Sequence, residues 1–281
     1  MHPTSSDENK TFVEPIDNGS DASAIDPSKS KEHWNKGAGM FGRMDIVDID
    51  SDYLRNIIKT YKGNLKNASV LDIGCGTGIW TLGLSEKVRR IVGIDMSETM
   101  IEFANLNKEK IKAENAEFYV SRWKDLKVGE GILSEKFDIV VIHMTPALRN
   151  MDDLKKVLDV CKGNCYYTTG VRRTSNVCDK LDTLCPERAP RPRTFMYRMA
   201  DLLLDLGIRP QLSYDSSVYD MEYTVEDLVN LYKDIYPELT RKQMRDALRP
   251  LSSRGVVVYH NCLEYVTLYW TMNDEKRVKK P

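Results

Sequence analysis

The sequence contains no apolar run that reaches the ~20 residues needed for a membrane-spanning helix. Its beginning, MHPTSSDENK, also lacks the apolar core of a secretion signal. The 41 basic and 42 acidic side chains nearly cancel, leaving a formal net charge of −1, so no overall charge attracts the chain to nucleic acid or to a membrane surface. These absences predict a soluble, cytoplasmic protein with no membrane partner, and they make a nucleic-acid partner unfavoured.

The 6 cysteines show no compact, regular spacing. A disulfide framework or a zinc site would require such a pattern, and the gaps between Cys161, Cys165, Cys178 and Cys185 match no ordinary zinc motif. Cys161 is expected on the apolar face of a helix. The sequence therefore predicts reduced thiols and no metal site.

The most informative stretch is VLDIGCGTG, residues 70–78. It opens as a short β-prone run, and Gly74, Gly76 and Gly78 then break the strand before a helical pattern begins at Ile79. Glycine permits positive φ and lets a ligand approach the backbone, and the first N–H groups of a helix have no partner within it. The pattern predicts a strand, a tight turn and a helix N-terminus that together bind a ligand.

A second apolar run, residues 91–94, ends at Asp95. An acid at the tip of the second strand of a βαβ unit is placed to accept both hydroxyls of a ribose. Two other nucleotide-binding patterns do not fit. The G-x-G-x-G spacing differs from the dinucleotide fingerprint, and no lysine follows Thr77 as a P-loop would require.

The DxGxGxG run followed one βα unit later by an acid resembles the first two motifs of class I S-adenosylmethionine-dependent methyltransferases. The resemblance implies S-adenosyl-L-methionine as cofactor, its amino-acid end held by the loop and its ribose by Asp95. The residues that it assigns to cofactor binding in this region are Asp72, Gly74, Cys75, Gly76, Gly78, Asp95 and Met96. The remaining alternative is a glycine turn in some other α/β protein.

The segment after the third expected strand, residues 117–120, departs from the family's pattern. Arg122 stands where relatives usually place an Asp that accepts the adenine amino group, and a guanidinium accepts no hydrogen bond. We therefore expect backbone groups near Arg122 and Trp123, or stacking, to hold the adenine. The Trp123 ring is a candidate wall of that site, with core packing as the equal alternative.

The two ends of the chain are polar. Residues 1–31 contain few large apolar side chains and are expected to be a disordered tail, as are residues 273–281. In the resembling family a segment such as residues 32–66 often folds over the cofactor as a lid. Trp34 or Arg43 would then contact the ligand, although Trp34 could equally pack on the core.

The run FDIVVI, residues 137–142, is expected to be a central strand buried on both faces. It ends at His143, beside the cofactor at the carboxyl edge of the sheet. Because histidine ordinarily titrates near neutrality, His143 is the candidate general base. The alternative is a hydrogen-bonded structural histidine.

Five βα-type units in order predict an α/β fold with a doubly wound, mostly parallel seven-stranded sheet, the Rossmann-like methyltransferase fold, over residues 32–272. We expect a small helical insertion at residues 224–251 and a closing strand or hairpin after it. Arginines between Arg172 and Arg198 either grip an anionic substrate or form a solvated loop.

The activity that the resemblance implies is methyl transfer to a small molecule, possibly anionic, by in-line displacement. The alternatives are an RNA or protein methyltransferase and a non-catalytic cofactor-binding sensor. A monomer and a homodimer are both compatible with the sequence.

Overall fold

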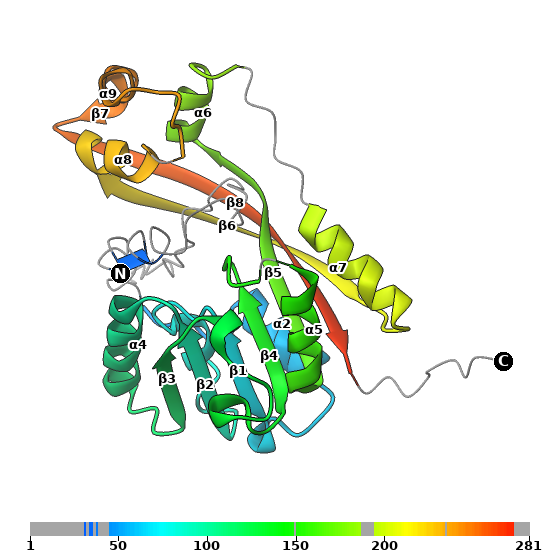
Figure 1. Ribbon diagram of the computed structural model, residues 1–281. Coiled ribbons are helices and arrows are strands. Elements are labelled where there is room, and N and C mark those ends of the chain that lie inside the picture. Colours follow the sequence, from blue (N-terminus) through cyan, green and yellow to red (C-terminus); the bar gives the residue numbers. More distant parts are fainter. Residues whose placement is uncertain are drawn as a thin grey trace, which may run out of the picture. The chain divides into compact units, whose positions relative to one another are not determined.

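The computed structural model describes Lys31, Trp34, Asn35, Ala38 and residues 45–148, 150–186, 194–233 and 235–272. Residues 1–30 and 273–281 of the predicted tails lie outside these residues, as does Arg43, whereas Lys31 at the end of the first tail is described. Strands and helices alternate in the first part of the chain (Figure 1). The strands are β1 Ser69–Ile73, β2 Arg90–Asp95, β3 Ala116–Val120, β4 Phe137–His143, β5 Cys161–Ser175, β6 Gln211–Tyr223, β7 Ser252–Ser253 and β8 Val256–Thr271.

The strands form one 8-stranded sheet in the order β3-β2-β1-β4-β5-β8-β6, with β7 paired to β8. β1 pairs in parallel with both β2 and β4, and the pairs β2–β3 and β4–β5 are also parallel. The chain therefore continues from β1 to one side of the sheet and later returns to the other, which creates a switch point between β1 and β4. The predicted doubly wound, mostly parallel fold is confirmed, with the short β7 added to the seven strands expected.

The helices begin largely where the capping residues predict. Ser51 accepts a hydrogen bond from the Leu54 N–H, and Ser97 accepts one from the Met100 N–H, as N-caps of the second and fourth helices. The α-helices are α2 Asp52–Thr60, α3 Ile79–Leu82, α4 Glu98–Ile111, α5 Met151–Val160, α6 Asn176–Asp182, α7 Thr194–Asp205, α8 Val225–Tyr232 and α9 Arg241–Leu248. Short 3₁₀ turns are η1 Leu65–Asn67, η2 Trp123–Asp125, η3 Gly131–Leu133 and η4 Arg249–Leu251.

Two hydrophobic clusters cover the two faces of the central strands. In β4, Ile139 and Val141 belong to the cluster that also contains residues of α2 and α4, whereas Val140 and Ile142 belong to the cluster with residues of α5 and α7. Successive side chains of a strand point to opposite faces, so β4 is buried on both sides, as its apolar sequence predicts. This double burial fixes where the carboxyl ends of β1, β2 and β4 meet.

The prediction for Cys161 is wrong. Helix α5 ends at Val160, and Cys161 adopts an extended conformation as the first residue of β5, opposite Phe137. The residue is nevertheless fully buried, because it enters the same apolar cluster from the strand. An apolar position at helical spacing therefore did not distinguish the last turn of a helix from the first residue of a strand.

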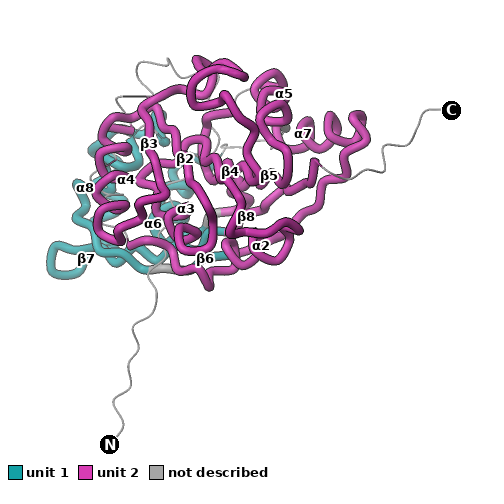
Figure 2. Tube along the Cα trace, turned by 90° about the horizontal axis from the view of Figure 1, so that it is seen from below, with its two compact units in different colours: residues 1–15, 173–188, 216–263 teal, residues 16–172, 189–215, 264–281 magenta. Residues whose placement is uncertain are grey.

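The chain divides into two compact units (Figure 2). Unit 2 comprises Ile16–Arg172, Ala189–Asp215 and Glu264–Pro281, and unit 1 includes Arg173–Arg188 and Ser216–Leu263. The boundaries at 172/173, 215/216 and 263/264 fall inside β5, β6 and β8, so each of these strands belongs partly to both units.

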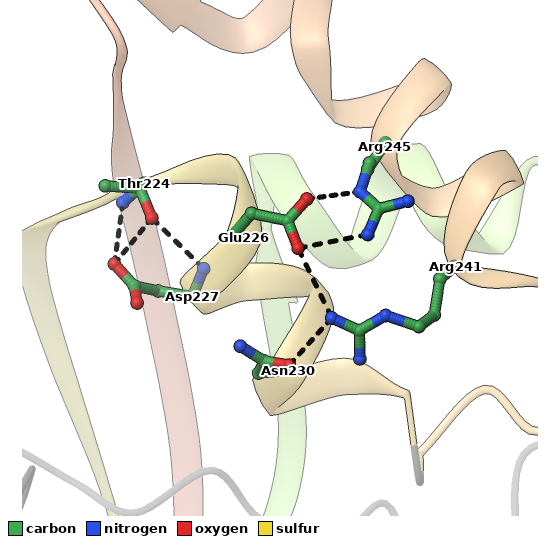
Figure 3. Close-up of polar contacts among 6 residues, drawn as sticks. All are labelled: Thr224, Glu226, Asp227, Asn230, Arg241 and Arg245. Carbon is green, nitrogen blue, oxygen red and sulfur yellow. Dashed lines mark hydrogen bonds and ion pairs between the residues drawn. The ribbon is translucent and has the colours of Figure 1, made fainter.

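Unit 1 contains the predicted helical insertion. Thr224 and Thr240 each form a capping box, with Asp227 and Gln243 respectively. Figure 3 shows the exposed polar contacts between α8 and α9: Arg245 forms an ion pair with Glu226, and the Arg241 guanidinium donates to Glu226 Oε2 at 3.3 Å and to Asn230 Oδ1 at 2.9 Å. Such exposed ion pairs contribute little stability each, so α8 and α9 depend mainly on their buried apolar residues.

Candidate functional site

The three glycines of the loop between β1 and α3 all adopt positive φ, at 73° for Gly74, 53° for Gly76 and 72° for Gly78. At two of them, neighbouring side chains also leave no room for a Cβ atom. A Cβ on Gly74 would lie 2.1 Å from Thr145 Oγ1, and one on Gly78 would lie 2.8 Å from Phe118 Cζ. A Cβ on Gly76 would meet no atom within 4 Å, so this glycine faces open space. The backbone at Gly76 is accessible to a ligand.

The backbone N–H groups of the loop hold its shape. Those of Gly74 and Cys75 donate to the Ile94 carbonyl at 2.8 and 2.9 Å, and that of Gly78 donates to the Cys75 carbonyl at 2.9 Å. The N–H of Gly76 donates to Asp95 Oδ2 at 3.0 Å. The loop is thus attached to the end of β2 before any ligand binds.

Asp95 ends β2 beside the loop, as predicted. Its carboxylate also accepts a hydrogen bond from the Ser97 N–H at 2.9 Å, and burial raises its pKa. A carboxylate has about four acceptor positions, so the capacity left over after the backbone hydrogen bonds from Gly76, Ser97 and Met96 can accept a further donor such as a ribose hydroxyl. The carboxyl ends of β1, β2 and β4 lie at the same edge of the sheet (Figure 1).

Asp72 lies beneath the loop and is 2% exposed. It accepts a hydrogen bond from Thr81 Oγ1 at 2.9 Å, which joins β1 to α3. Burial, with a smaller contribution from the charge of Asp95, raises the pKa of Asp72 to about 7. The side chain of Cys75 is buried against Gly93, and burial raises its pKa. Both side chains support the loop from below, and the prediction that they contact cofactor stays a prediction.

The structure favours core packing for Trp123. Its ring is 3% exposed, its Nε1 donates to the Asp153 carbonyl at 3.3 Å, and Lys156 Nζ lies 4.3 Å from the ring centroid. The Arg122 guanidinium is largely exposed and donates to Asp125 Oδ2 at 2.9 Å. Neither side chain offers an acceptor for an adenine amino group, which leaves backbone groups for that role.

Two residues of the leading segment contact the start of α4. Lys31, the last residue of the predicted tail, forms an ion pair with Glu98. Ser97, two residues after Asp95, donates a hydrogen bond from its Oγ to Oδ1 of Asn35, which belongs to the predicted lid. Trp34 and Met96 are both half-buried. These contacts place part of the leading segment near the expected ribose position.

His143 ends β4 as predicted, but the expectation that it titrates near neutrality is wrong. The side chain is 8% exposed, and burial lowers its pKa to about 3. Its ring centroid lies 4.2 Å from that of Trp80 and 4.5 Å from that of Tyr53. Its Nε2 is enclosed and has no hydrogen-bond partner among the described residues. His143 is therefore neutral at physiological pH.

Sequence reasoning missed the two aromatic neighbours of His143. Tyr53 comes directly before Leu54, the first residue of an apolar i, i+3, i+4 pattern in α2, yet it is 1% exposed. Trp80 follows the last loop glycine by two residues, and this proximity to the motif was the available signal. Thr145, whose Oγ1 leaves no room for a side chain at Gly74, was also missed.

Of the arginines considered as an anion grip, Arg172 and Arg198 are exposed. Arg188, Arg191 and Arg193 lie outside the described residues, as does the side chain of Arg173. Cys75, Cys161, Cys165, Cys178 and Cys262 are free thiols. In the described ranges, no group of three or more His, Cys, Asp or Glu side chains could hold a metal ion.

These features occur in a known class of domain. Residues 64–183, which include the loop, Asp95 and His143, match the family model described as a methyltransferase domain. The fold is similar to that of a putative type II methyltransferase from Anaeromyxobacter dehalogenans, with a TM-score of 0.50, 14% identity, and coverage of 78% of this chain and 94% of that one. Residues 64–183 are therefore similar to a methyltransferase domain, and the fold that contains them is that of a solved putative methyltransferase.

Two curated relatives match parts of this chain. The demethylmenaquinone methyltransferase of Lactococcus lactis is 38% identical over 139 residues, 48% of this chain and 53% of that protein. The mouse tRNA (uracil-5-)-methyltransferase homolog A is 28% identical over 120 residues, 39% of this chain and 20% of that protein. The chain thus spans about half the length of the first relative and less of the second.

Proposed function

We propose that the protein is an S-adenosyl-L-methionine-dependent methyltransferase that acts on a small-molecule acceptor. The observation that carries the proposal is the loop of Gly74, Gly76 and Gly78, held at the tip of β2 by Asp95 and open on the side of Gly76. The match of residues 64–183 to a methyltransferase domain supports it.

The cofactor would supply a methyl group on a positively charged sulfur. The open backbone at Gly76 would accommodate the cofactor, and the remaining acceptor positions of Asp95 would bind its ribose hydroxyls. Because Asp95 already holds Gly76, the same carboxylate would couple the loop's shape to cofactor binding. Trp34 and residue Arg43 remain candidate contacts from the lid.

The chain's contribution to the reaction would be mainly orientation. Displacement at a methyl group needs the attacking atom about 3 Å away and in line, and holding it there lowers the barrier without a covalent residue. A histidine with a pKa of about 3 is a weak base, so we assign His143 to the wall of the site and not to proton removal. An acceptor that is already deprotonated, or that loses its proton to water, suits this site.

Two other functions compete with this one. An RNA methyltransferase is favoured by the tRNA-modifying relative, but that match covers only 20% of the relative. A cofactor-binding sensor is favoured by Arg122 in place of the usual acid. Nitrocellulose filter binding of bulk RNA at increasing salt tests the first, because RNA binding falls steeply as salt rises.

Calorimetry and turnover together test the proposal itself. Titration with S-adenosyl-L-homocysteine should give 1:1 binding, and a screen of amine, hydroxyl, thiol and carboxyl acceptors with radiolabelled cofactor should give a methylated product. Absence of binding would overturn the proposal. Binding without product from any acceptor class would favour the sensor, and salt-sensitive RNA binding with RNA methylation would favour the RNA enzyme.

A further inference from the structure

Asn107 is a polar residue at a core position of α4. The buried face of this helix contains Met100, Ile101 and Ala104, and Asn107 lies three residues after Ala104 on the same face. Its side chain is enclosed, since the residue is 8% exposed. Such a position is ordinarily apolar, because a buried amide needs hydrogen-bond partners and asparagine is a weak helix former. A departure of this kind from the apolar pattern is typical of functional positions.

The partner of Asn107 belongs to the loop between β1 and α3. The Asn107 Nδ2 donates to the Thr77 carbonyl at 3.0 Å, in a buried contact. The N–H of the next residue, Gly78, donates to the Cys75 carbonyl at 2.9 Å. The peptide group that joins Thr77 to Gly78 is planar, and it is bonded at both its oxygen and its nitrogen. Its orientation is therefore fixed.

The preceding residue, Gly76, is fixed by a different side chain. Its N–H donates to Asp95 Oδ2 at 3.0 Å, and Asp95 Oδ1 accepts from the N–H of Ser97, the N-cap of α4. The loop residue that faces open space thus lies between two contacts made by side chains, one from Asp95 and one from Asn107. A backbone that is fixed in this way loses less conformational entropy when a ligand binds to it.

We propose that Asn107 is a positioning residue for the cofactor, whose amide fixes the loop backbone that receives the amino-acid end of S-adenosyl-L-methionine. This inference rests on the proposed methyltransferase function. Asn107 does not touch the cofactor and acts through the Thr77 carbonyl. Without the amide, that buried carbonyl lacks its donor and the peptide between Thr77 and Gly78 is free to turn. The adenosine end depends on Asp95 instead, because Asp95 binds the ribose.

The test compares two ligands, S-adenosyl-L-homocysteine and 5′-methylthioadenosine, which has the same nucleoside and sulfur but lacks the amino-acid end. Both are titrated by calorimetry into the full-length native protein and into Asn107→Leu, whose side chain branches at the same atom and has no donor. The native protein should bind S-adenosyl-L-homocysteine at least about tenfold more tightly than 5′-methylthioadenosine. In Asn107→Leu this preference should disappear, while the affinity for 5′-methylthioadenosine stays as in the native protein.

Asn115→Leu is the matched control. The Asn115 Nδ2 also donates to backbone carbonyls, those of Ser85 and Val88, each at 2.9 Å, but these lie outside the loop. This variant should lose stability, measured as the melting temperature, and should keep the native affinity for both ligands. Asn107→Ala, which removes the amide without filling its place, repeats the comparison in case leucine at this position prevents folding.

A native preference for S-adenosyl-L-homocysteine that persists in Asn107→Leu or Asn107→Ala would overturn the inference. Equal affinity of the native protein for the two ligands would also overturn it, because the loop would then not receive the amino-acid end. Equal loss of both ligands in the variants would show that Asn107 acts on overall stability alone. Failure of the native protein to bind S-adenosyl-L-homocysteine would instead overturn the proposed function.

Discussion

The carboxylate of Asp95 accepts a hydrogen bond from the backbone N–H of Gly76 across a distance of 3.0 Å. Gly74, Gly76 and Gly78 all adopt positive φ, and of these three only Gly76 faces open space. Asp95 thus holds the glycine that a ligand can approach. The contact links the shape of the loop to the acid expected to bind the ribose, and the first two predictions follow from it.

Replacing Asp95 by Ala should weaken binding of S-adenosyl-L-homocysteine by roughly 2 kcal/mol or more, because the variant loses the ribose acceptors and releases the Gly76 N–H. Isothermal titration calorimetry measures the change. Glu102→Gln, at an exposed position on α4, is the matched control and should bind as the native protein does. Unchanged affinity in the Asp95 variant would contradict the ribose assignment.

Replacing Gly74 by Ala and replacing Gly76 by Ala should have different effects. The first should mainly lower the free energy of unfolding, and the second should mainly weaken cofactor binding. At Gly74 the new Cβ would lie 2.1 Å from Thr145 Oγ1, so we expect a loss of about 2 kcal/mol or more of unfolding free energy. At Gly76 only the cost of positive φ, about 1 kcal/mol, is expected, but the added methyl group would enter the space of the ligand.

Urea unfolding and cofactor titration of the two variants check this pair. Gly129→Ala, also at positive φ with no atom within 4 Å, is the control for backbone strain away from the site. If Gly76→Ala binds the cofactor as tightly as Gly129→Ala does, the ligand does not approach the loop at Gly76.

The stability of the protein should carry a signature of Asp72. Its pKa is raised from 3.8 to about 7 in the folded state, so between these values the folded protein holds a proton that the unfolded chain has lost. The contribution of Asp72 therefore makes the unfolding free energy fall as pH rises through this window, by at most about 1.4 kcal/mol per pH unit. Above pH 7 both states are ionised and the penalty stays constant.

The difference between the native protein and Asp72→Asn isolates most of this contribution, because the acids other than Asp95, whose charge acts on Asp72, titrate alike in both. Urea unfolding from pH 4 to pH 8 should show the variant gaining stability relative to the native protein as pH increases. A constant difference across that range would show that the Asp72 pKa is not raised.

His143 should not titrate between pH 5 and pH 8, because burial holds its pKa at about 3. Proton NMR of the imidazole resonances measures this directly, and His143→Asn identifies which resonance belongs to it among the 4 histidines. If His143 is no base, the rate of methyl transfer should have the same dependence on pH near pH 6.5 in the native protein and in His143→Asn. An inflection present in the native protein and absent from the variant is not expected. Such an inflection would restore His143 as a general base.

Local patterns in the sequence predicted the fold well. Ser51, Ser97 and Thr240 cap helix starts, where a side-chain oxygen satisfies an N–H that the helix itself cannot, and such caps can be recognised in a sequence. The apolar run of β4 identified a doubly buried strand, and the glycine spacing identified the loop. These features depend on neighbours in sequence, which is why one sequence sufficed.

Features that depend on contacts between distant segments were not predictable in the same way. The His143 pKa depends on burial against Tyr53 and Trp80, which come from two different helices. Cys161 was misassigned because apolar spacing alone does not mark where a helix ends.

The three strands that belong partly to both units have a consequence for engineering. Because the boundaries fall inside β5, β6 and β8, a chimera that exchanged unit 1 with that of a relative would need three junctions, each in the middle of a hydrogen-bonded strand. Each junction would have to preserve strand register, since a slip of one residue turns every following side chain to the opposite face. Unit 1 is therefore better altered by point substitution than by transplanting a segment.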